Sequence, residues 1–424
     1  MSLLESLPLL LGICICAAVC AQTGAWFVGW RRDRKLREQE HALRRDLLIE
    51  ELSIAQAQRR AAETRQFGWQ GFRKFVVHAK VPESDDVVSL YLVPQDGRPL
   101  PTYLPGQFVS FRLRSADGRA LLRCYSLSDR PRPEYYRVSI KRIAGSSERP
   151  AGAVSLLIHD ELNAGDLVEL QAPAGSFVFD AYERRPAILI GAGIGITPIY
   201  AMAAQAAEVR SPRQIVLFHG VRNGREHVYR QALQDLRREH PRLQIVTCYS
   251  RPAASDRVGR DYDVEGRISI DLLRELLPSN NYDFYLCGPG SLMSELVDGL
   301  RAWGVPDAAI RFEAFGPSTA RPNAGRSSGA VDATSGSADA TGAAIRFVRS
   351  GRETRGTVGE TLLETAERAN VELPSSCRGG SCGTCATRLI AGRVDYAEPP
   401  AHRCESGECL PCVARPRGDV ELDA

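Results

Sequence analysis

AILIGAGIGITP, residues 187–198, runs from a short apolar segment into three closely spaced glycines. The apolar segment predicts a buried strand, and Gly191, Gly193 and Gly195 predict a tight turn after it. Such a turn lets the backbone approach a pyrophosphate at the positive end of the next helix. Thr197 and Pro198 suit the N-cap and first turn of that helix. We therefore predict a strand–turn–helix unit that binds a dinucleotide.

The same rhythm continues downstream, where QIVLFHG, LQIVTCYS and YDFYLCGPG each precede a helix-forming stretch. This alternation predicts an α/β domain with a mostly parallel sheet over residues 181–315. Two features disfavour a simple Rossmann dehydrogenase. Ile196 stands where the third glycine of G-x-G-x-x-G would be, and no acidic residue follows the second strand.

Upstream, the pattern changes to short runs of alternating polar and apolar residues, such as FRKFVVHAKV, VVSLYLVP and YYRVSIKRI. Turn sequences including QDGRP, LPGQ and NAGD separate the runs at short intervals. This spacing predicts an antiparallel β-barrel over residues 67–180.

The C-terminal block, residues 344–424, carries a C-x4-C-x2-C motif formed by Cys377, Cys382 and Cys385. This is the spacing of plant-type 2Fe-2S proteins, which use a distant fourth cysteine. Gly379, Gly380 and Gly383 would let the loop wrap tightly around a cluster. A zinc site would favour two CxxC pairs, and only one occurs. From spacing alone, the fourth ligand is one of three thiols: Cys404, Cys409 or Cys412. Residues 316–343, rich in Gly, Ser and Ala, predict a flexible linker before this block.

The N-terminus has a different composition. Residues 7–30 carry no charge and end in Trp26, Phe27 and Trp30, and the basic run RRDRK follows at once. This pattern predicts a transmembrane anchor over residues 1–30, with the N-terminus outside and the catalytic domains in the cytoplasm. A cleaved signal peptide is the alternative, although it would want a basic start. Residues 31–66 predict a charged stalk helix.

The composition supports several domains and disfavours a nucleic-acid partner. A chain of 424 residues exceeds one ordinary core, and its 54 basic and 51 acidic residues leave a net charge of only +3. If the soluble domains lie in a reducing compartment, clustered cysteines indicate metal binding rather than disulfides.

The order LPGQFVSFRL, RCYSLS (residues 123–128), GAVS (152–155) and NAGDLVELQAPAGSF resembles the flavin-binding barrel of the ferredoxin-NADP reductase superfamily, especially the reductase half of flavohemoglobins. The resemblance implies FAD rather than FMN, although related dioxygenase reductases can use FMN. It implies that Arg123, Tyr125 and Ser126 contact the flavin. It places the flavin phosphates on backbone N–H groups of a helix start, which comprises Gly152, Ala153, Val154 and Ser155.

The downstream motifs resemble the nucleotide half of the same superfamily. The resemblance places Gly191, Gly193, Gly195, Thr197 and Pro198 at NADH or NADPH. It adds YLCGPG, with Cys287, Gly288 and Pro289 beside the nicotinamide, and FEAFGP, with Glu313 and Phe315 near the flavin. Ser126, Thr197, Cys287 and Glu313 are thus the expected residues at hydride transfer. Arg222, Arg225, Ser250 and Arg251 could bind a 2′-phosphate, so the coenzyme stays open between NADH and NADPH.

The last block resembles the ferredoxin domain fused to many flavin reductases, which implies a β-grasp fold and a fourth thiolate in an L-x-C-x-x-x-P context. Leu410, Cys412 and Pro416 match that context, so the resemblance selects Cys412 as the fourth ligand, with Cys377, Cys382 and Cys385.

The expected protein is a membrane-anchored reductase that passes electrons from NAD(P)H through FAD and a 2Fe-2S cluster to a redox partner. The partner could be an oxygenase, a membrane-bound desaturase or monooxygenase, or a hybrid-cluster protein. One alternative is the NADH-input subunit of a membrane respiratory complex, in which family the cluster domain precedes the flavin domain. Another is a redox sensor without enzymatic turnover.

Overall fold

The structure, a computed structural model, describes residues 3–114, 120–145, 152–315, 342–357, 359–371, 373–375, 380, 383–397, 400 and 404–424. The chain divides into two compact units, Met1–Ala61 and Ala62–Ala424. Most of the predicted linker, residues 316–341, lies outside the described residues, as do Cys377 and Cys382.

The N-terminal residues form one helix, α1 (Leu3–Phe67), which contains the predicted stalk. The structure contradicts the predicted membrane anchor and the orientation inferred from it. Among the described residues, no helix combines the length and the apolar character that crossing a bilayer requires. The aromatic residues expected at a membrane interface instead pair with arginines one turn later. Arg31 lies 4.5 Å from the Phe27 ring centroid and Arg34 lies 5.7 Å from that of Trp30.

The next region is a six-stranded antiparallel sheet with strand order β4-β3-β6-β1-β2-β5, as the alternating sequence predicts. A bridge between Leu127 and Val138 joins the two edges, next to β4 and within β5. Phe75, Leu90 and Phe111 are fully buried in its core. The bounds are β1 Arg73–Ser84, β2 Val87–Pro94, β3 Phe108–Arg114, β4 Ala120–Ser126, β5 Tyr136–Lys141, α2 Ala153–Asp160 and β6 Leu167–Leu170.

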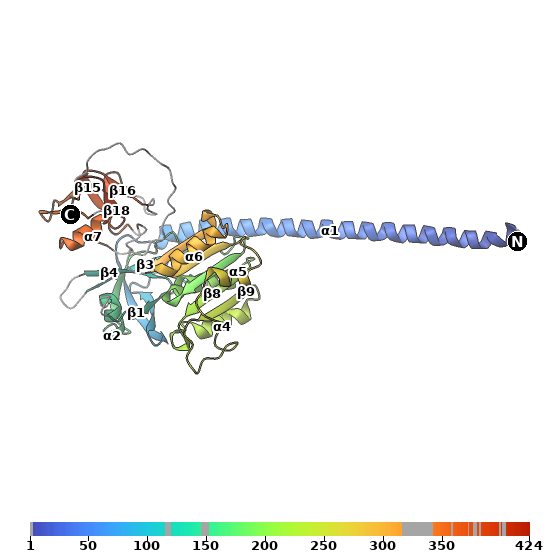
Figure 1. Ribbon diagram of the computed structural model, residues 1–424, viewed down its shortest axis with the longest axis horizontal. Helices are drawn as coiled ribbons and strands as arrows, with labels where there is room; N and C mark the ends of the chain where they lie inside the picture. The colour runs from blue at the N-terminus through green and yellow to red at the C-terminus, as the bar shows by residue number, and fades with distance from the viewer. Residues whose placement is uncertain are drawn as a thin grey trace. The chain divides into compact units, whose positions relative to one another are not determined.

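The α/β region contains a six-stranded sheet of order β10-β9-β8-β7-β11-β12 in which every pairing is parallel, which confirms the predicted parallel sheet. Alternate residues of β7 face opposite layers: Leu189 packs with α3 and α4, whereas Ile190 packs with α5 and α6. Figure 1 shows α4 and α6 on opposite sides of strands β8 and β9. The bounds are β7 Ala187–Ala192, η1 Gly193–Gly195, α3 Ile196–Glu208, β8 Ile215–Val221, η2 Gly224–Glu226, α4 Arg230–Glu239, β9 Leu243–Tyr249, β10 Val264–Glu265, α5 Ile270–Leu276, β11 Asp283–Pro289, α6 Gly290–Ala302, η3 Asp307–Ala309 and β12 Ile310–Phe315.

The C-terminal region combines a five-stranded mixed sheet, order β14-β13-β19-β15-β17, with a two-stranded sheet and one helix. The helix begins with a reciprocal capping box between Thr361 and Glu364. Ile345, Phe347 and Leu362 are fully buried in the core of the C-terminal region. The bounds are β13 Ala344–Phe347, β14 Arg352–Arg355, α7 Leu362–Arg368, β15 Thr387–Ala391, β16 Val394–Tyr396, β17 Glu408–Cys409, β18 Ala414–Pro416 and β19 Val420–Leu422.

Candidate cofactor sites

The glycine-rich turn between β7 and α3 is shaped by close backbone contact. A Cβ atom on Gly195 would lie 2.2 Å from the carbonyl oxygen of Cys287, and one on Gly191 would lie 2.9 Å from the Cα of Ile196. Gly193 has open space around it but a φ of +56°, which favours glycine. Two of the three glycines therefore permit close packing and one permits the turn itself.

The helix that follows begins earlier than we predicted. Gly195, not Thr197, is the N-cap of α3, and Thr197 lies inside the first turn. The Thr197 hydroxyl donates to the carbonyl of Ile194, 3.0 Å away. Pro198 then sits in the first turn, where its missing N–H costs nothing. The prediction of Thr197 as N-cap is wrong because the 3₁₀ turn at Gly193–Gly195 leads directly into the helix.

Three strand ends bring the predicted nicotinamide-site residues together. In the register of the parallel sheet, Cys287 of β11 lies opposite Gly191 of β7 on one side and Glu313 of β12 on the other. Strand β7 lies between β8 and β11, so the chain order reverses at this point of the sheet. Such a reversal opens a crevice at the carboxyl ends of the strands, where open α/β sheets bind ligands. Phe315 ends β12 at this edge, paired with Pro289, and Gly288 lies opposite Ala314.

The Cys287 side chain is fully buried in the core that includes α3. Burial, followed by the nearby Glu313 charge, raises the pKa of the Cys287 thiol well above its ordinary value. The group is therefore a neutral thiol and not a nucleophile at physiological pH. A buried, neutral thiol would bring no charge to a nicotinamide site at this edge of the sheet.

The predicted flavin motif lies at the end of β4. Ser126 is buried, whereas Arg123 is exposed and donates to the carbonyl of Leu122. The Tyr125 ring packs edge-on against Phe111 with the centroids 5.3 Å apart, and burial raises the pKa of Tyr125. The strand thus offers a charged group, an aromatic ring and a hydroxyl in sequence, which fits a phosphate-bearing planar ring.

The predicted phosphate site is the start of α2, with Gly152 as the N-cap. The first N–H groups of a helix, here those of Ala153, Val154 and Ser155, have no intrahelical acceptors. The Ser155 hydroxyl donates to the Gly152 carbonyl at 2.8 Å and accepts from the Ile143 N–H at 3.2 Å. A Cβ on Gly152 would lie 2.6 Å from that hydroxyl. The small cradle and the first-turn N–H groups, which have no acceptor among the described residues, fit a phosphate.

Two of the four predicted cluster ligands lie within the described residues, and they are close together. The Cys385 and Cys412 sulfurs are 3.1 Å apart and both side chains are buried. Gly380 and Gly383 have φ values of +71° and +70°, as the predicted wrapping of the loop requires. Thiolates this close repel each other unless a metal or a proton is shared between them, so the pair fits a metal site.

The competing thiols are placed differently. Cys409 lies in the main core of this region with Phe347 and Leu362. Cys385 and Cys412 lie in a second apolar cluster, on whose edge Cys404 packs. Burial raises the pKa of the Cys409 thiol to about 12. This separation supports Cys412 over Cys409 as the fourth ligand.

The side chains predicted for a 2′-phosphate are partly engaged. Arg222 pairs with Glu226 at 3.1 Å, and Arg225 pairs with Asp85 at 2.7 Å. The Ser250 hydroxyl is 3.4 Å from the carbonyl of Val221. Arg251 is exposed and has no ion pair with any described residue. Two of the three predicted arginines are thus already neutralised.

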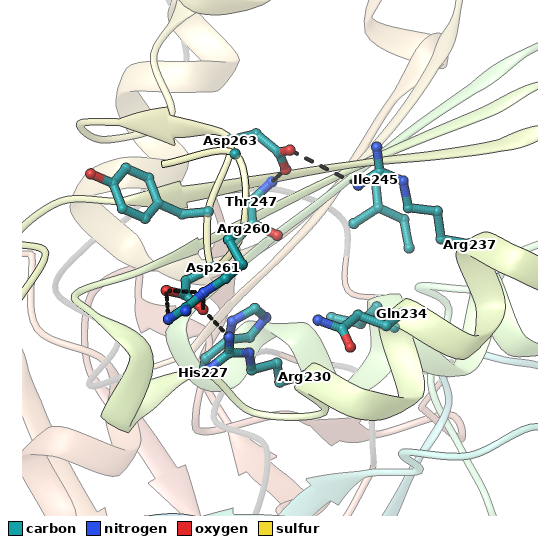
Figure 2. A pocket seen from close by; sticks show the side chains of 12 residues that line it. His227, Arg230, Gln234, Arg237, Ile245, Thr247, Arg260, Asp261 and Asp263 are labelled. Carbon is teal, nitrogen blue, oxygen red and sulfur yellow. Dashed lines mark hydrogen bonds and ion pairs between the residues drawn. The ribbon is translucent and has the colours of Figure 1, made fainter. Parts of the chain in front are cut away.

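Sequence reasoning missed a hollow of about 70 Å³ beside α4 and β9 (Figure 2). Three arginines and two aspartates line it: Arg230 and Arg260 pair with Asp261, and Arg237 lies 3.9 Å from Asp263. The hydrogen bond from Arg260 is the main cause that lowers the pKa of Asp261 to about 2.

Three family models match the chain in order: the oxidoreductase FAD-binding domain over residues 74–179, the oxidoreductase NAD-binding domain over 189–298 and the 2Fe-2S iron-sulfur cluster binding domain over 346–417. The first covers the flavin motifs, the second the nucleotide turn, and the third all four predicted cluster cysteines.

Similar proteins include a flavohemoprotein of Rhizobium meliloti, 38% identical over 257 residues, or 60% of this chain and 63% of that one. The chain thus spans less than two thirds of this relative. The FAD/NAD-binding domain of nitric oxide dioxygenase from Vibrio cholerae is 34% identical with a TM-score of 0.52, covering 58% of this chain and 99% of that one. Phthalate dioxygenase reductase is 26% identical with a TM-score of 0.51, covering 84% of this chain and 98% of that one.

Proposed function

Because the chain belongs to the ferredoxin-NADP reductase superfamily of FAD- and NAD-binding oxidoreductases and carries a C-terminal 2Fe-2S domain, we propose that it takes electrons from NADH or NADPH and delivers them singly to a separate redox protein. The last domain would adopt the predicted β-grasp fold and present the cluster to that partner.

The observation that carries this proposal is the order of the three domains in one chain. The same structural plan extends over nearly all of phthalate dioxygenase reductase, whose structure is described as modular for electron transfer from pyridine nucleotides to [2Fe-2S]. A nicotinamide donates two electrons as a hydride and a 2Fe-2S cluster accepts one, and a bound flavin supplies the conversion between them.

In this proposal, residues of the two central domains bind the flavin and the nicotinamide coenzyme and orient them. The N–H groups of Ala153, Val154 and Ser155 would bind the flavin phosphate, and Tyr125 would pack against the ring system. The turn at Gly193 would admit the pyrophosphate of the coenzyme. Cys287 and Glu313, side by side in the sheet, would line the nicotinamide crevice.

Four thiols, Cys377, Cys382, Cys385 and Cys412, would hold the cluster. Zinc is disfavoured because the loop has plant-type spacing and left-handed glycines at Gly380 and Gly383. Cys404 and Cys409 would stay neutral beside the site, since burial raises the pKa of both thiols.

The partner we propose is an oxygenase, by analogy with phthalate dioxygenase reductase. Hydroxylating enzymes need electrons one at a time. The 2Fe-2S cluster that we propose in the last domain would donate electrons in this way. The respiratory-complex alternative is disfavoured by domain order, because in this chain the FAD-binding domain precedes the 2Fe-2S domain.

Turnover with artificial acceptors tests the proposal. Purified protein should reduce ferricyanide and cytochrome c with NADH or NADPH as donor, and each preparation should contain flavin and two irons per chain. Reduction of an oxygenase in the presence of this chain, but not by NAD(P)H alone, identifies the partner class. A preparation that binds neither flavin nor iron while remaining folded contradicts the proposal.

A further inference from the structure

Arg137 is a buried arginine next to the Leu127–Val138 bridge, where the two edges of the antiparallel sheet meet. It lies on β5 and is 7% exposed. Its guanidinium donates to the carbonyl of Ser128 through Nε at 3.1 Å and through Nη2. The Ser128 N–H donates in return to the Arg137 carbonyl at 2.9 Å. Ser128 is two residues beyond Ser126, so this arginine fixes the end of the strand that carries the flavin motif.

The same guanidinium packs against two tyrosines of the α/β region that also contact each other. Its Cζ is 5.0 Å from the ring centroid of Tyr200 and 4.8 Å from that of Tyr229. The two ring centroids are 4.6 Å apart. Tyr200 lies on α3, one turn after Thr197 of the nucleotide motif. Arg137 therefore connects the flavin motif with the helix of the nucleotide motif.

The hydroxyl of Tyr229 extends this contact into a buried polar network. It donates to Ser139 Oγ, which lies 3.0 Å from Ser128 Oγ and 2.6 Å from Ser89 Oγ. Burial raises the pKa of Tyr229, so its hydroxyl remains a donor. Tyr229 also has a φ of +59°, a conformation that a bulky residue adopts only when its surroundings hold it.

Ion pairs surround this buried centre. The segment that ends at Tyr229 also carries Arg225, paired with Asp85 at 2.7 Å, and Glu226, paired with Lys141 at 3.2 Å. The Asp85 N–H donates to the Arg225 carbonyl at 3.3 Å. Exposed pairs of this kind contribute little alone, so the buried arginine and tyrosines dominate the contact.

We propose that Arg137 is a positioning residue for hydride transfer: packed against Tyr200 and Tyr229, it fixes the strand end of the flavin motif relative to the helix of the nucleotide motif. The inference rests on the proposed function for its kinetic consequence, because a misplacement of about 1 Å between reacting groups can cost on the order of 100-fold in rate. The contact itself exists independently of that function.

Arg137→Lys tests the proposal because it keeps the charge and removes the planar fork that both hydrogen-bonds and stacks. Tyr229→Phe is a milder second variant that keeps the ring and removes the hydroxyl that bonds to the buried serines. Arg213→Lys is the matched control, since Arg213 is fully buried and paired with Asp283 at 2.8 Å but makes no hydrogen bond, ion pair or ring contact with the described residues 123–128 or 191–200.

Three measurements are made on the intact, cofactor-loaded chain. Hydrogen exchange of residues 84–90 and 222–230 reports the contact without reference to activity. The Kd of ADP-ribose, which lacks the nicotinamide, reports the nucleotide half. The limiting rate of flavin reduction by NADH or NADPH under anaerobic conditions reports hydride transfer.

We expect Arg137→Lys to speed exchange in both segments and to lower the limiting reduction rate by about tenfold or more, with the Kd of ADP-ribose within about twofold of the parent. Tyr229→Phe should change the same quantities less. Arg213→Lys should lower the melting temperature yet leave the reduction rate of the folded protein unchanged.

The proposal is overturned if neither Arg137→Lys nor Tyr229→Phe changes exchange in the two segments, or if exchange rises while the reduction rate stays at the parent value. An equal loss of rate in Arg213→Lys also overturns it, since the effect would then be general destabilisation. If the parent flavin accepts no electrons from NADH or NADPH, the proposed function fails instead, and the exchange result still decides whether the contact exists.

Discussion

At the residue scale, the three glycines of the nucleotide turn have different reasons to be glycine. Gly195 lies against the backbone of β11, where a Cβ would come within 2.2 Å of the Cys287 carbonyl oxygen. Backbone of a central strand cannot move aside without separating β7 from β11. A Cβ on Gly193 would meet no atom within 4 Å, and only the φ of +56° at this residue opposes substitution.

Gly195→Ala should therefore damage the nucleotide site much more than Gly193→Ala. We expect Gly193→Ala to cost about 1 kcal/mol in stability, the penalty of a left-handed alanine, with coenzyme binding weakened moderately. Gly195→Ala should abolish measurable binding of ADP-ribose or yield unfolded protein. Calorimetric titration together with thermal melting separates these results, and equal Kd values for the two variants would contradict the packing argument.

The cysteines of the C-terminal region also differ in ways that spacing does not show. Cys412 and Cys385 face the same apolar cluster, whereas Cys409 packs in the main core. The chain turns between them at residues 411–413, where the N–H groups of Val413 and Ala414 donate to the Leu410 carbonyl at 3.0 and 2.9 Å. The two thiols thereby enter different apolar clusters.

Cys412→Ser should lose the cluster, because a neutral hydroxyl is a far weaker iron ligand than a thiolate. Its flavin should remain reducible, so ferricyanide reduction by NAD(P)H should persist while cytochrome c reduction falls at least tenfold. Cys409→Ser, the matched control, should keep its iron with some loss of stability. Iron analysis and electron paramagnetic resonance decide between them, and loss of iron in Cys409→Ser alone would show that the assigned ligand is wrong.

At the scale of elements, strand β8 and the segment after it bury two uncharged histidines. His219 is fully buried, and burial holds its pKa well below the ordinary value. Burial lowers the pKa of His227 to about 4, and its Nδ1 lies 2.9 Å from the hydroxyl of Tyr249. Both rings must therefore be neutral in the folded chain.

This arrangement makes stability depend on pH. Between about pH 6.5 and 4 the unfolded chain binds a proton at His227 and the folded chain does not, so stability falls as pH falls. For His227 alone the loss from pH 7.5 to 5 is about 2 kcal/mol. His227→Gln should remove this part of the pH dependence, measured by urea unfolding, and the exposed His78→Gln should not. A slope unchanged by His227→Gln would refute the assignment.

The elements were predictable where the signal is local. Alternating patterns predicted the antiparallel sheet, and apolar runs followed by helix formers predicted the parallel one. The start of α3 was misplaced because Thr197 and Pro198 resemble a cap, whereas the chain enters the helix through a 3₁₀ turn at Gly193–Gly195. Helix propensity does not reveal that close packing against β11 determines where α3 begins.

The positioning contact was not predictable from sequence. Arg137 appears in YRVSIK as an ordinary polar residue of an alternating strand. Its role depends on Tyr200 and Tyr229, which lie more than sixty residues away along the chain and approach it only in the folded molecule. That Gly191, Cys287 and Glu313 lie side by side could be predicted only from the resemblance to the reductase superfamily, because strand order depends on the tertiary fold.

At the scale of the whole molecule, three domain types in one chain account for a route from a two-electron donor to a one-electron acceptor. The prediction of a membrane anchor was wrong, because no helix among the described residues is long and apolar enough to cross a bilayer; the N-terminal residues belong to one helix, α1, that continues through the charged stretch to Phe67. The proposed electron acceptor is therefore not inferred from a membrane location.

The central claim, that electrons pass from NAD(P)H to the 2Fe-2S cluster within this chain, is tested most directly by anaerobic rapid mixing with one equivalent of NADH or NADPH, followed by freeze-quench electron paramagnetic resonance. The account predicts that flavin absorbance falls first and that the signal of a reduced 2Fe-2S cluster then appears, whereas Cys412→Ser shows only the first phase. A fully reduced flavin beside a cluster that stays oxidised would contradict it.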